Sequence, residues 1–244
     1  MRKLFELGGL VAAAVLIAFG VAALVMGIGG HGTVASSLKQ ESITGSPDMT
    51  PAGIAPEVKD ILASQQQIAA AQAKAGVPVD QRFALTKVEA PGCSVAGKLV
   101  SSGNSARCFA QYMRIHALGA SGGLVYSQMG RFIAKPGTPA KLTDFGGATS
   151  DSRYAVVDPK TKQPVSNGRR DLWVTETALT TALNTSYMAT QISLFGIVVG
   201  VALLLSGLGF GILAVGGALR SHETALTLGK RTTKPIAPAP LSPA

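Results

Sequence analysis

The sequence predicts a mainly α-helical protein in which two transmembrane helices flank a mostly helical extracytoplasmic domain with few short strands. The second span is expected to continue outward as a long helix. Residues 177–219 contain no Asp, Glu, Lys or Arg, and a second such run covers residues 7–38. About 20 apolar residues suffice to cross a bilayer, so both runs are long enough to span. The chain between them has the length of one domain.

The two apolar runs set the expected domain boundaries. The first is expected to be a retained helix and not a cleaved signal peptide. The apolar region of a signal peptide is about 7–15 residues long, whereas this one extends from Leu7 to Ile28. The expected parts are a cytoplasmic N-terminus at 1–6, transmembrane helix 1 at 7–29, an extracytoplasmic domain at 30–188, transmembrane helix 2 at 189–219 and a disordered cytoplasmic tail at 220–244.

The expected orientation follows from the basic residues, because Lys and Arg close to a span favour the cytoplasmic side. Two of them, Lys39 and Arg170, flank the spans on the side of the domain. Six lie on the opposite flanks: Arg2, Lys3, Arg220, Lys230, Arg231 and Lys234. We therefore expect both termini in the cytoplasm and residues from about 30 to 188 outside a plasma membrane.

The chain has two cysteines, Cys93 and Cys108, and both lie in the middle region. An oxidising compartment outside the membrane would allow them to form a disulfide, which we expect. Two free buried thiols are the alternative. A zinc site is less well supported, because a structural zinc takes four ligands and no His lies nearby in the sequence.

Small residues recur three, four or seven positions apart in both apolar runs, which places them on one face of each helix. In lipid, close packing of backbones through small residues holds helices together. We expect these two faces to pack on each other, although they could serve a partner's helix or a homo-oligomer instead. The residues are Gly9, Ala13, Gly20, Ala23 and Gly27 in the first run, and Gly196, Gly200, Gly207 and Gly211 in the second.

Two soluble helices are expected in the domain, at 56–74 and 105–118, with a third short one at 124–134. Pro56 suits a first helical turn, and Gly76 with Pro78 ends the first of these helices. The sequence FALTKV (83–88) and the sequence RYAVVD (153–158) have the composition of short strands. Residues 135–170, which contain several turn signals, are expected to be irregular.

A long helix is expected to begin near Asp171 and to run unbroken through the second span. No Gly or Pro occurs between Asp171 and Phe195, so nothing in that stretch interrupts a helix. Trp173, Leu179 and Leu183 are expected to anchor the external domain on this stalk. The competing interpretation is a break at 184–186 that brings Trp173 back to the membrane surface.

The sequence offers few residues for catalysis. The expected topology separates the three histidines, His31, His116 and His222, whereas a non-haem iron site needs two His and a carboxylate on one centre. The segment GASGG (119–123) is more typical of a turn than of an anion site. We therefore predict no enzyme activity and no catalytic, cofactor-binding or metal-ligating residue, and His116 is expected to be a structural core residue.

Two further classes of function, nucleic-acid binding and transport, are disfavoured. The formal net charge of +9 could indicate nucleic-acid binding, but the basic residues are scattered and no aromatic residues alternate with them to stack on bases. Neither expected span contains an ionisable residue, whereas ion and proton pathways through a membrane usually do. Nucleic acid is therefore not an expected partner, and a stand-alone transporter is not expected.

Three segments resemble a group of uncharacterised two-pass membrane proteins from actinobacteria, some of which carry an aromatic ring-opening dioxygenase label. The segments are LKQESITGSPDMTP (38–51), GKLVSSGNSARCFAQYMRIHALGASGGLVYSQM (97–129) and DPKTKQPVSNGRRDLWVTETALTTALNTSYM (158–188). The resemblance implies a bacterial plasma-membrane protein. It supplies no catalytic residues.

Two functional hypotheses follow. The first is a non-enzymatic accessory or structural subunit whose external domain docks on a membrane or envelope complex. The second is an envelope sensor or binding module for a small ligand, a lipid or a cell-wall component. The expected partners are the lipid bilayer and another membrane or envelope protein, and a homo-oligomer is compatible with either hypothesis. No cofactor is expected.

Overall fold

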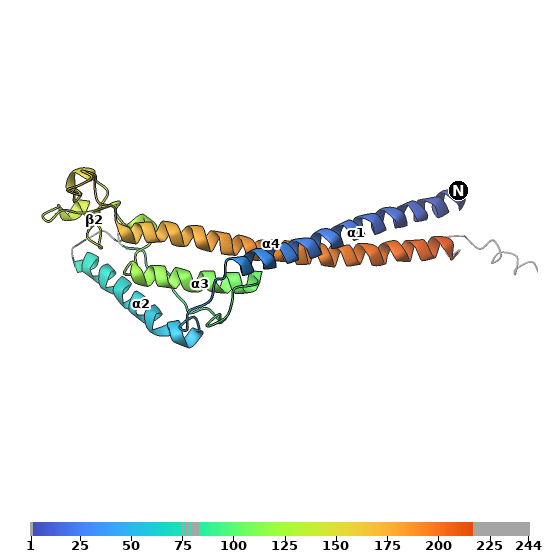
Figure 1. Cartoon of the computed structure of the whole chain (residues 1–244), viewed down its shortest axis with the longest axis horizontal. Helices are drawn as coiled ribbons and strands as arrows, with labels where there is room; N and C mark the ends of the chain where they lie inside the picture. The colour runs from blue at the N-terminus through green and yellow to red at the C-terminus, as the bar shows by residue number, and fades with distance from the viewer. Residues whose placement is uncertain (1, 75, 77–78, 80–82, 217–244) are drawn as a thin grey trace, which may run out of the picture. The chain divides into compact units, whose positions relative to one another are not determined.

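The computed structural model describes residues 2–74, 76, 79 and 83–216 (Figure 1). These residues are mainly helical. The elements are α1 (Arg2–Gln40), α2 (Pro51–Lys74), α3 (Gly103–Ala120), η2 (Tyr126–Gln128), β1 (Phe132–Ile133), η3 (Ala140–Leu142), β2 (Ala148–Thr149), η4 (Ser152–Tyr154) and α4 (Gly168–Val215). They form two compact units. One contains the chain up to Val25 and from Gly196 onward, and the other is Met26–Phe195.

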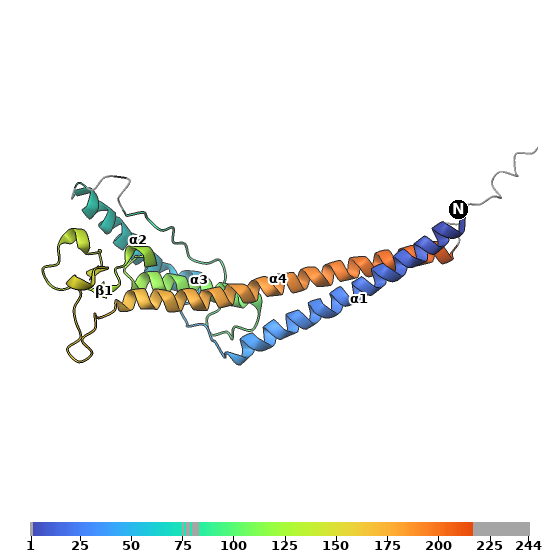
Figure 2. The ribbon, with the colours of Figure 1, turned by 90° about the horizontal axis from the view of Figure 1, so that it is seen from above.

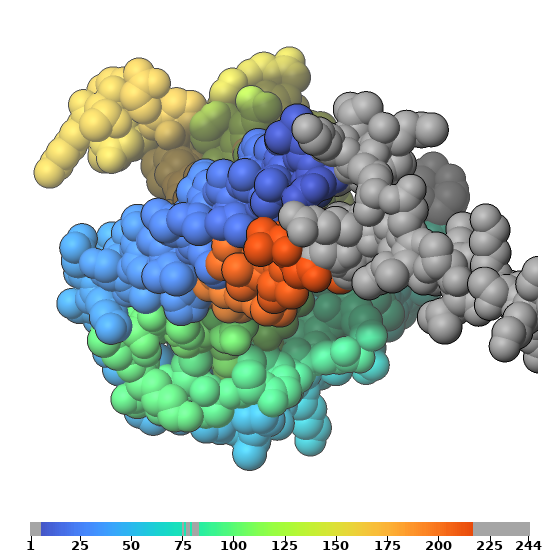
Figure 3. All heavy atoms as spheres, turned by 90° about the vertical axis from the view of Figure 1, so that its right-hand side faces the viewer, coloured from blue at the N-terminus to red at the C-terminus, as the bar shows by residue number. Residues whose placement is uncertain are grey.

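The first unit pairs the N-terminal part of α1 with the C-terminal part of α4. Seen from its end, the blue surface of α1 lies against the orange surface of α4 (Figure 3). Both helices are long and apolar enough to cross a membrane, and only 17% of the most apolar stretch of each is buried. Large apolar side chains such as Phe19, Leu205 and Ile212 are more than half exposed. This amount of exposed apolar surface is typical of lipid-facing helices and of interaction sites.

The second unit is a helical domain that includes the remaining parts of α1 and α4. In both ribbon views α3 runs alongside α4, and α2 packs on α3 (Figures 1 and 2). Its core combines side chains of all four helices. Among the buried members are Leu38 of α1, Ile54 and Ile61 of α2, Tyr112 and Leu118 of α3, and Trp173 and Leu183 of α4. The domain is therefore built directly on the extensions of the two apolar helices.

Helix α2 begins at Pro51, five residues before the predicted start at Pro56. Thr50 explains the earlier start, because its hydroxyl accepts a hydrogen bond from Gly53 N at 2.8 Å and its carbonyl accepts one from Ile54 N at 3.1 Å. A Thr at this position satisfies amides that the first turn leaves without partners. Pro51 then takes the first helical position, which Pro favours, and Pro56 lies inside the helix.

The predicted helix at 105–118 is confirmed as α3, which extends two residues further at each end. Ser102 caps it: the Ser102 hydroxyl accepts from Ser105 N, and the Ser105 hydroxyl accepts from Ser102 N. This reciprocal pair is a capping box with Ser in the place where Glu or Gln is commoner. The helix carries His116 and much of the core on one face.

Two glutamines of α2 fasten the extended segment 83–102 to the domain. Gln65 is fully buried, donates to Gly123 O at 3.0 Å and accepts from Thr86 N at 3.1 Å. Gln72 accepts from Phe83 N in the same way. FALTKV (83–88) forms no strand, and two of its amides, those of Phe83 and Thr86, pair with these glutamine side chains instead of a neighbouring strand.

The predicted short helix at 124–134 is wrong. The segment contains a single turn, η2, followed by β1, which pairs with β2 in antiparallel register through Phe132–Thr149 and Ile133–Ala148. Asp144 stabilises this arrangement by accepting from Gly130 N and Ala148 N. The residues between β1 and α4 are mostly irregular, as predicted. The predicted strand RYAVVD does not form: its first two residues belong to η4, and Ala155 and Val157 make isolated bridges.

Helix α4 is continuous from Gly168 to Val215, with no break at 184–186. It begins three residues before the predicted start, because the Asn167 carbonyl accepts from Arg170 N and Asp171 N. At about 1.5 Å per residue, a helix of 48 residues measures roughly 72 Å, more than twice the ~30 Å of a bilayer core. The predicted end of the span at Leu219 and the predicted disordered tail at 220–244 lie outside the described residues.

Candidate functional site

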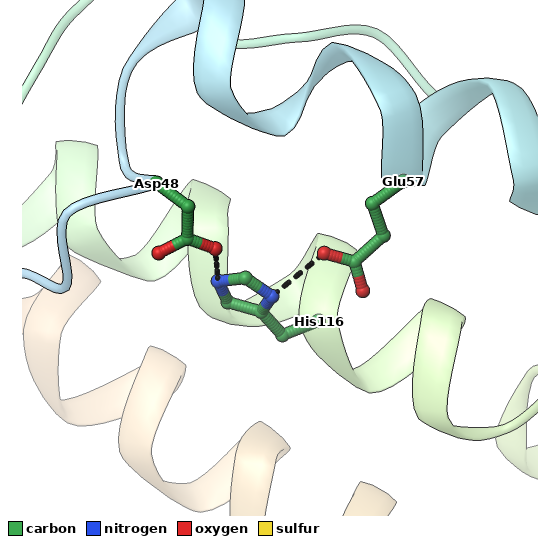
Figure 4. A group of neighbouring side chains, drawn as sticks. All are labelled: Asp48, Glu57 and His116. Atoms are coloured by element: carbon green, nitrogen blue, oxygen red, sulfur yellow. Dashed lines mark hydrogen bonds and ion pairs between the residues drawn. The ribbon is translucent and has the colours of Figure 1, made fainter.

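His116 lies between two carboxylates that come from separate segments of the chain (Figure 4). Its Nδ1 is 2.8 Å from Glu57 Oε2 of α2, and its Nε2 is 3.3 Å from Asp48 Oδ2 in the turn before α2. All three side chains are partly buried. The prediction of a structural role for His116 did not include these two acidic partners.

Local structure positions both carboxylates. Asp48 lies in a turn where its Oδ1 accepts a hydrogen bond from the Ser46 hydroxyl. This bond is the main cause that lowers the pKa of Asp48, and the nearby His116 acts in the same direction. Glu57 reaches over Gly119 of α3, where a Cβ atom would collide with Glu57 Oε1. A glycine at this position therefore makes room for the Glu57 side chain.

Asp48, Glu57 and His116 offer one ligand atom each within 4.8 Å of one another. Figure 4 shows, however, that the two carboxylates face opposite nitrogens of the ring. A single metal ion is bound by only one nitrogen of an imidazole. The arrangement therefore fits a His116 bridge between the Asp48 turn, α2 and α3 better than a metal centre.

A pocket of about 220 Å³ adjoins His116 between α3 and α4. Most of its wall is apolar and consists of Met113, Ala117 and Ala120 of α3 with Leu172 and Leu179 of α4. The remaining lining residues are His116, Thr175 and Glu176. Such a combination of apolar wall and few polar groups is typical of small-molecule sites, although this pocket is smaller than most.

Glu176 is the unusual residue of this pocket. It is only 4% exposed, and its Oε1 has no hydrogen-bond partner among the described residues. Burial raises the pKa of its carboxyl, against the charge of Arg114 and the hydroxyls of Thr180 and Thr177, which lower it. The Thr177 hydroxyl is 3.5 Å from Oε2, at the limit of a hydrogen bond.

The structure joins the predicted cysteine pair, Cys93 and Cys108, in a disulfide with an S–S distance of 2.08 Å. It links the extended segment to the first turns of α3. The Tyr112 hydroxyl, one turn further along α3, donates to Cys93 O at 2.6 Å. The loop that the disulfide closes is thus fixed to α3 by two independent links.

The predicted stalk residues lie in the core of the domain. Trp173 is 3% exposed, donates from Nε1 to Leu124 O at 2.9 Å and has the Arg114 guanidinium 5.2 Å from its ring. Leu183 is buried, and Leu179 is partly buried against the same core. Trp173 therefore links α4 to the loop that follows α3.

The small residues of both predicted faces lie on the covered side of their helices. A Cβ atom added to Gly200 would meet Gly20 O and Leu24, and one added to Gly207 would meet Ala13 O and Ile17. Gly211 faces Ala13 at 3.7 Å. The other members, Gly9, Ala23, Gly27 and Gly196, are buried or half-buried.

Sequence reasoning missed Asp48, Glu57 and Glu176. The first two are distant from His116 in the sequence, and no pattern linked them to it. Glu176 did have a signal: it is three residues from both Trp173 and Leu179 and seven from Leu183, so it shares their helical face. An acidic residue on the face that anchors a core is unusual.

No protein-family model matches this chain, and neither a curated protein nor a solved structure is significantly similar to it.

Proposed function

We propose that this protein is a non-enzymatic accessory or structural subunit of a cell-envelope complex, anchored in a bacterial plasma membrane by two helices. In this proposal α1 spans near 7–29 and α4 from 189 onward, both termini are cytoplasmic, and the domain at 30–188 is outside. The domain presents a surface to a partner protein outside the membrane.

One observation carries the proposal: the domain core includes Leu38 of α1 together with Trp173 and Leu183 of α4. These side chains belong to the two helices that also carry the apolar stretches, so the same two helices contribute to the domain core. A domain core that uses the anchoring helices themselves supports a structural subunit. The His116 bridge and the disulfide give the domain further fixed links between its segments.

A binding module for a small ligand is the second candidate, and a specific observation favours it. The pocket between α3 and α4 contains the buried carboxyl of Glu176 among apolar side chains. A subunit of a larger complex could also carry such a pocket, so the two candidates are compatible.

The test is purification of the full chain in a mild detergent after cross-linking in cells, followed by mass spectrometry. Exposed lysines on the domain offer attachment points: Lys87, Lys98, Lys135 and Lys160. The proposal expects a stoichiometric protein partner with cross-links to these lysines. A chain that is recovered alone, or whose cross-links join only copies of itself, would contradict the accessory role.

A matched control separates docking by the domain from association within the membrane. Replacing every lysine of the domain by arginine, these four together with Lys39, Lys59, Lys74, Lys141 and Lys162, keeps the charge but removes the primary amines with which the cross-linker reacts. The partner should then still copurify without cross-linking, while its covalent attachment to the domain is lost. Unchanged cross-linking yields would show that the attachment is made elsewhere.

A further inference from the structure

A pocket of about 690 Å³ lies in the loop region around β1 and β2. Its wall is formed by residues 127–130, 141–144 and 148–152. These loops lie beside the start of α4 (Figures 1 and 2), where the Asn167 side chain donates to Gly130 O at 3.0 Å. The volume falls in the range of about 300–1,000 Å³ that is usual for small-molecule sites.

Most of the side chains in this wall are polar. Nine of the thirteen lining residues have a polar side chain, and five of these carry a hydroxyl: Ser127, Thr143, Thr149, Ser150 and Ser152. The Thr143 hydroxyl donates to Pro139 O, and the Thr149 hydroxyl accepts from Asp151 N. The hydroxyls of the three serines have no hydrogen-bond partner among the described residues, and all three residues are exposed. They are therefore free to bind a ligand.

The charged groups of the wall compensate one another. The carboxylates are Asp144, which accepts from three backbone amides, and Asp151, which forms an ion pair with Arg153 at 2.6 Å. Lys141 is the basic residue of the wall, and its ammonium group has no partner within the described part of the chain. With Arg153 counted as the partner of Asp151, the formal charges of the wall cancel. The charge of the wall therefore favours neither an anion nor a cation.

The wall also differs from that of an apolar site. A ligand without hydrogen-bonding groups would displace water from the serine hydroxyls and from Lys141 without replacing its hydrogen bonds, which costs free energy. A neutral ligand with several hydroxyls avoids this cost, because each hydroxyl both donates and accepts. The composition of the wall thus matches a neutral, polyhydroxylated molecule.

We propose that this pocket binds a neutral mono- or disaccharide. The ligand hydroxyls exchange hydrogen bonds with Ser127, Ser150 and Ser152, and Lys141 donates to a further oxygen of the sugar. The proposal uses only the loops around β1 and β2 and goes beyond the accessory role, so either proposal can fail without the other.

The experiment is isothermal titration of the purified full-length protein with neutral saccharides, in a detergent that has no sugar headgroup. The probes are glucose, maltose and N,N′-diacetylchitobiose, each titrated to about 10 mM so that affinities in the millimolar range are detected. Maltobionic acid and chitobiose are the charged ligand controls, because they carry a carboxylate and amines in place of neutral groups.

Two variants test the site, and a third is their control. Ser127→Ala combined with Ser152→Ala removes two hydroxyls that have no partner in the described part of the domain, so the fold stays intact. Ser150→Trp fills the pocket, and Ser94→Trp places the same side chain at an exposed serine that does not line it. Circular dichroism and the unfolding temperature show whether each variant is folded.

We expect saturable binding of at least one neutral probe, with an affinity that does not fall when salt is raised, because screening acts on charges. Binding should be at least about tenfold weaker for the charged controls, since like charges in a binding site repel. The double alanine variant and Ser150→Trp should lose binding to a similar extent, whereas Ser94→Trp keeps it. The proposal is overturned if no neutral probe binds saturably, if a charged control binds more tightly than its neutral counterpart, or if the folded double alanine variant binds as tightly as the wild type.

Discussion

Gly20 of α1 and Gly200 of α4 face each other with no room for a side chain between them. A Cβ atom on Gly200 would stand 2.9 Å from Gly20 O, and one on Gly20 would stand 3.0 Å from Gly200 O. The obstacles are backbone atoms, which cannot move aside as the end of a flexible side chain can. Glycine at both positions is therefore what permits this approach of the two helices.

Gly200→Leu should destabilise the protein in detergent by about 1–3 kcal/mol, the usual cost of overpacking. Gly209→Leu is the matched control, because it lies in the same helix and a Cβ atom there meets nothing within 4 Å. Chemical unfolding followed by circular dichroism measures both. Equal stability of the two variants would mean that this face does not hold α1 and α4 together, and loss of a copurifying protein at unchanged stability would assign the face to a partner.

Replacing both Cys93 and Cys108 by Ser should lower the free energy of unfolding by about 3 kcal/mol, because the disulfide closes a loop of about 15 residues in the unfolded chain. Denaturant titration of the wild type and the double variant gives the difference. Thiol counting is the independent check: the unreduced wild type, once denatured, should react with no maleimide. Reaction with two equivalents per chain would show that the bridge does not form.

His116→Gln should destabilise the domain by about 1 kcal/mol, since partly exposed ion pairs contribute little and Gln cannot bond both Glu57 and Asp48 as the ring does. His31→Gln is the control, because His31 is exposed on α1. Thermal unfolding of both variants at neutral pH decides the question. If the two variants lose equal stability, the bridge at His116 has no structural role.

The buried carboxyl of Glu176 predicts a pH-dependent effect. Its pKa is raised from the ordinary value of 4.5, mainly by burial. Folding therefore favours the neutral form of the carboxyl. The stability that this preference contributes is fully present below the ordinary pKa and is lost as the pH rises through the raised pKa of the folded protein. Glu176→Gln is neutral at every pH, so its unfolding temperature should match the wild type near about pH 4 and exceed it near about pH 8.

Thermal unfolding across this pH range measures the difference between the two proteins, in which the titration of distant groups common to both cancels. Asp60→Asn, at an exposed position of α2, is the control and should show no gain that grows with pH. A constant difference between Glu176→Gln and the wild type at all pH values would mean that the carboxyl is not destabilised by burial in the folded protein.

The long helices were the most predictable part of the fold, because uncharged runs and the absence of Gly and Pro are local properties of the chain. The unbroken helix through 184–186 follows from such signals, and so does the presence of α3. The start of α2 was predicted less well, because Pro56 carries a helix-start signal whereas the hydrogen bonds of Thr50 place the start at Pro51. Pro51 and Pro56 both suit a first helical turn, and the cap at Thr50 places the start at Pro51.

The candidate site was far less predictable. His116 and Glu57 are separated by 59 residues, and only the packing of α2 on α3 brings them together. The pairing of Gln65 and Gln72 with the segment after α2 depends on the same tertiary contacts and replaced the expected strand at 83–88. Glu176 could have been singled out from its spacing to Trp173 and Leu183, but its missing hydrogen-bond partner is visible only in the folded domain.

The most direct test of the central claim, that two spans hold the domain outside and both termini inside, is cysteine labelling on spheroplasts with a membrane-impermeant maleimide. Thr161→Cys lies in an exposed turn of the domain, and Ser242→Cys lies near the C-terminus. The native disulfide does not react with maleimide, so each introduced thiol reports alone. We predict that Thr161→Cys is labelled in intact spheroplasts and that Ser242→Cys is labelled only after permeabilisation. Labelling of Ser242→Cys from outside, or protection of Thr161→Cys until the membrane is opened, would contradict the account.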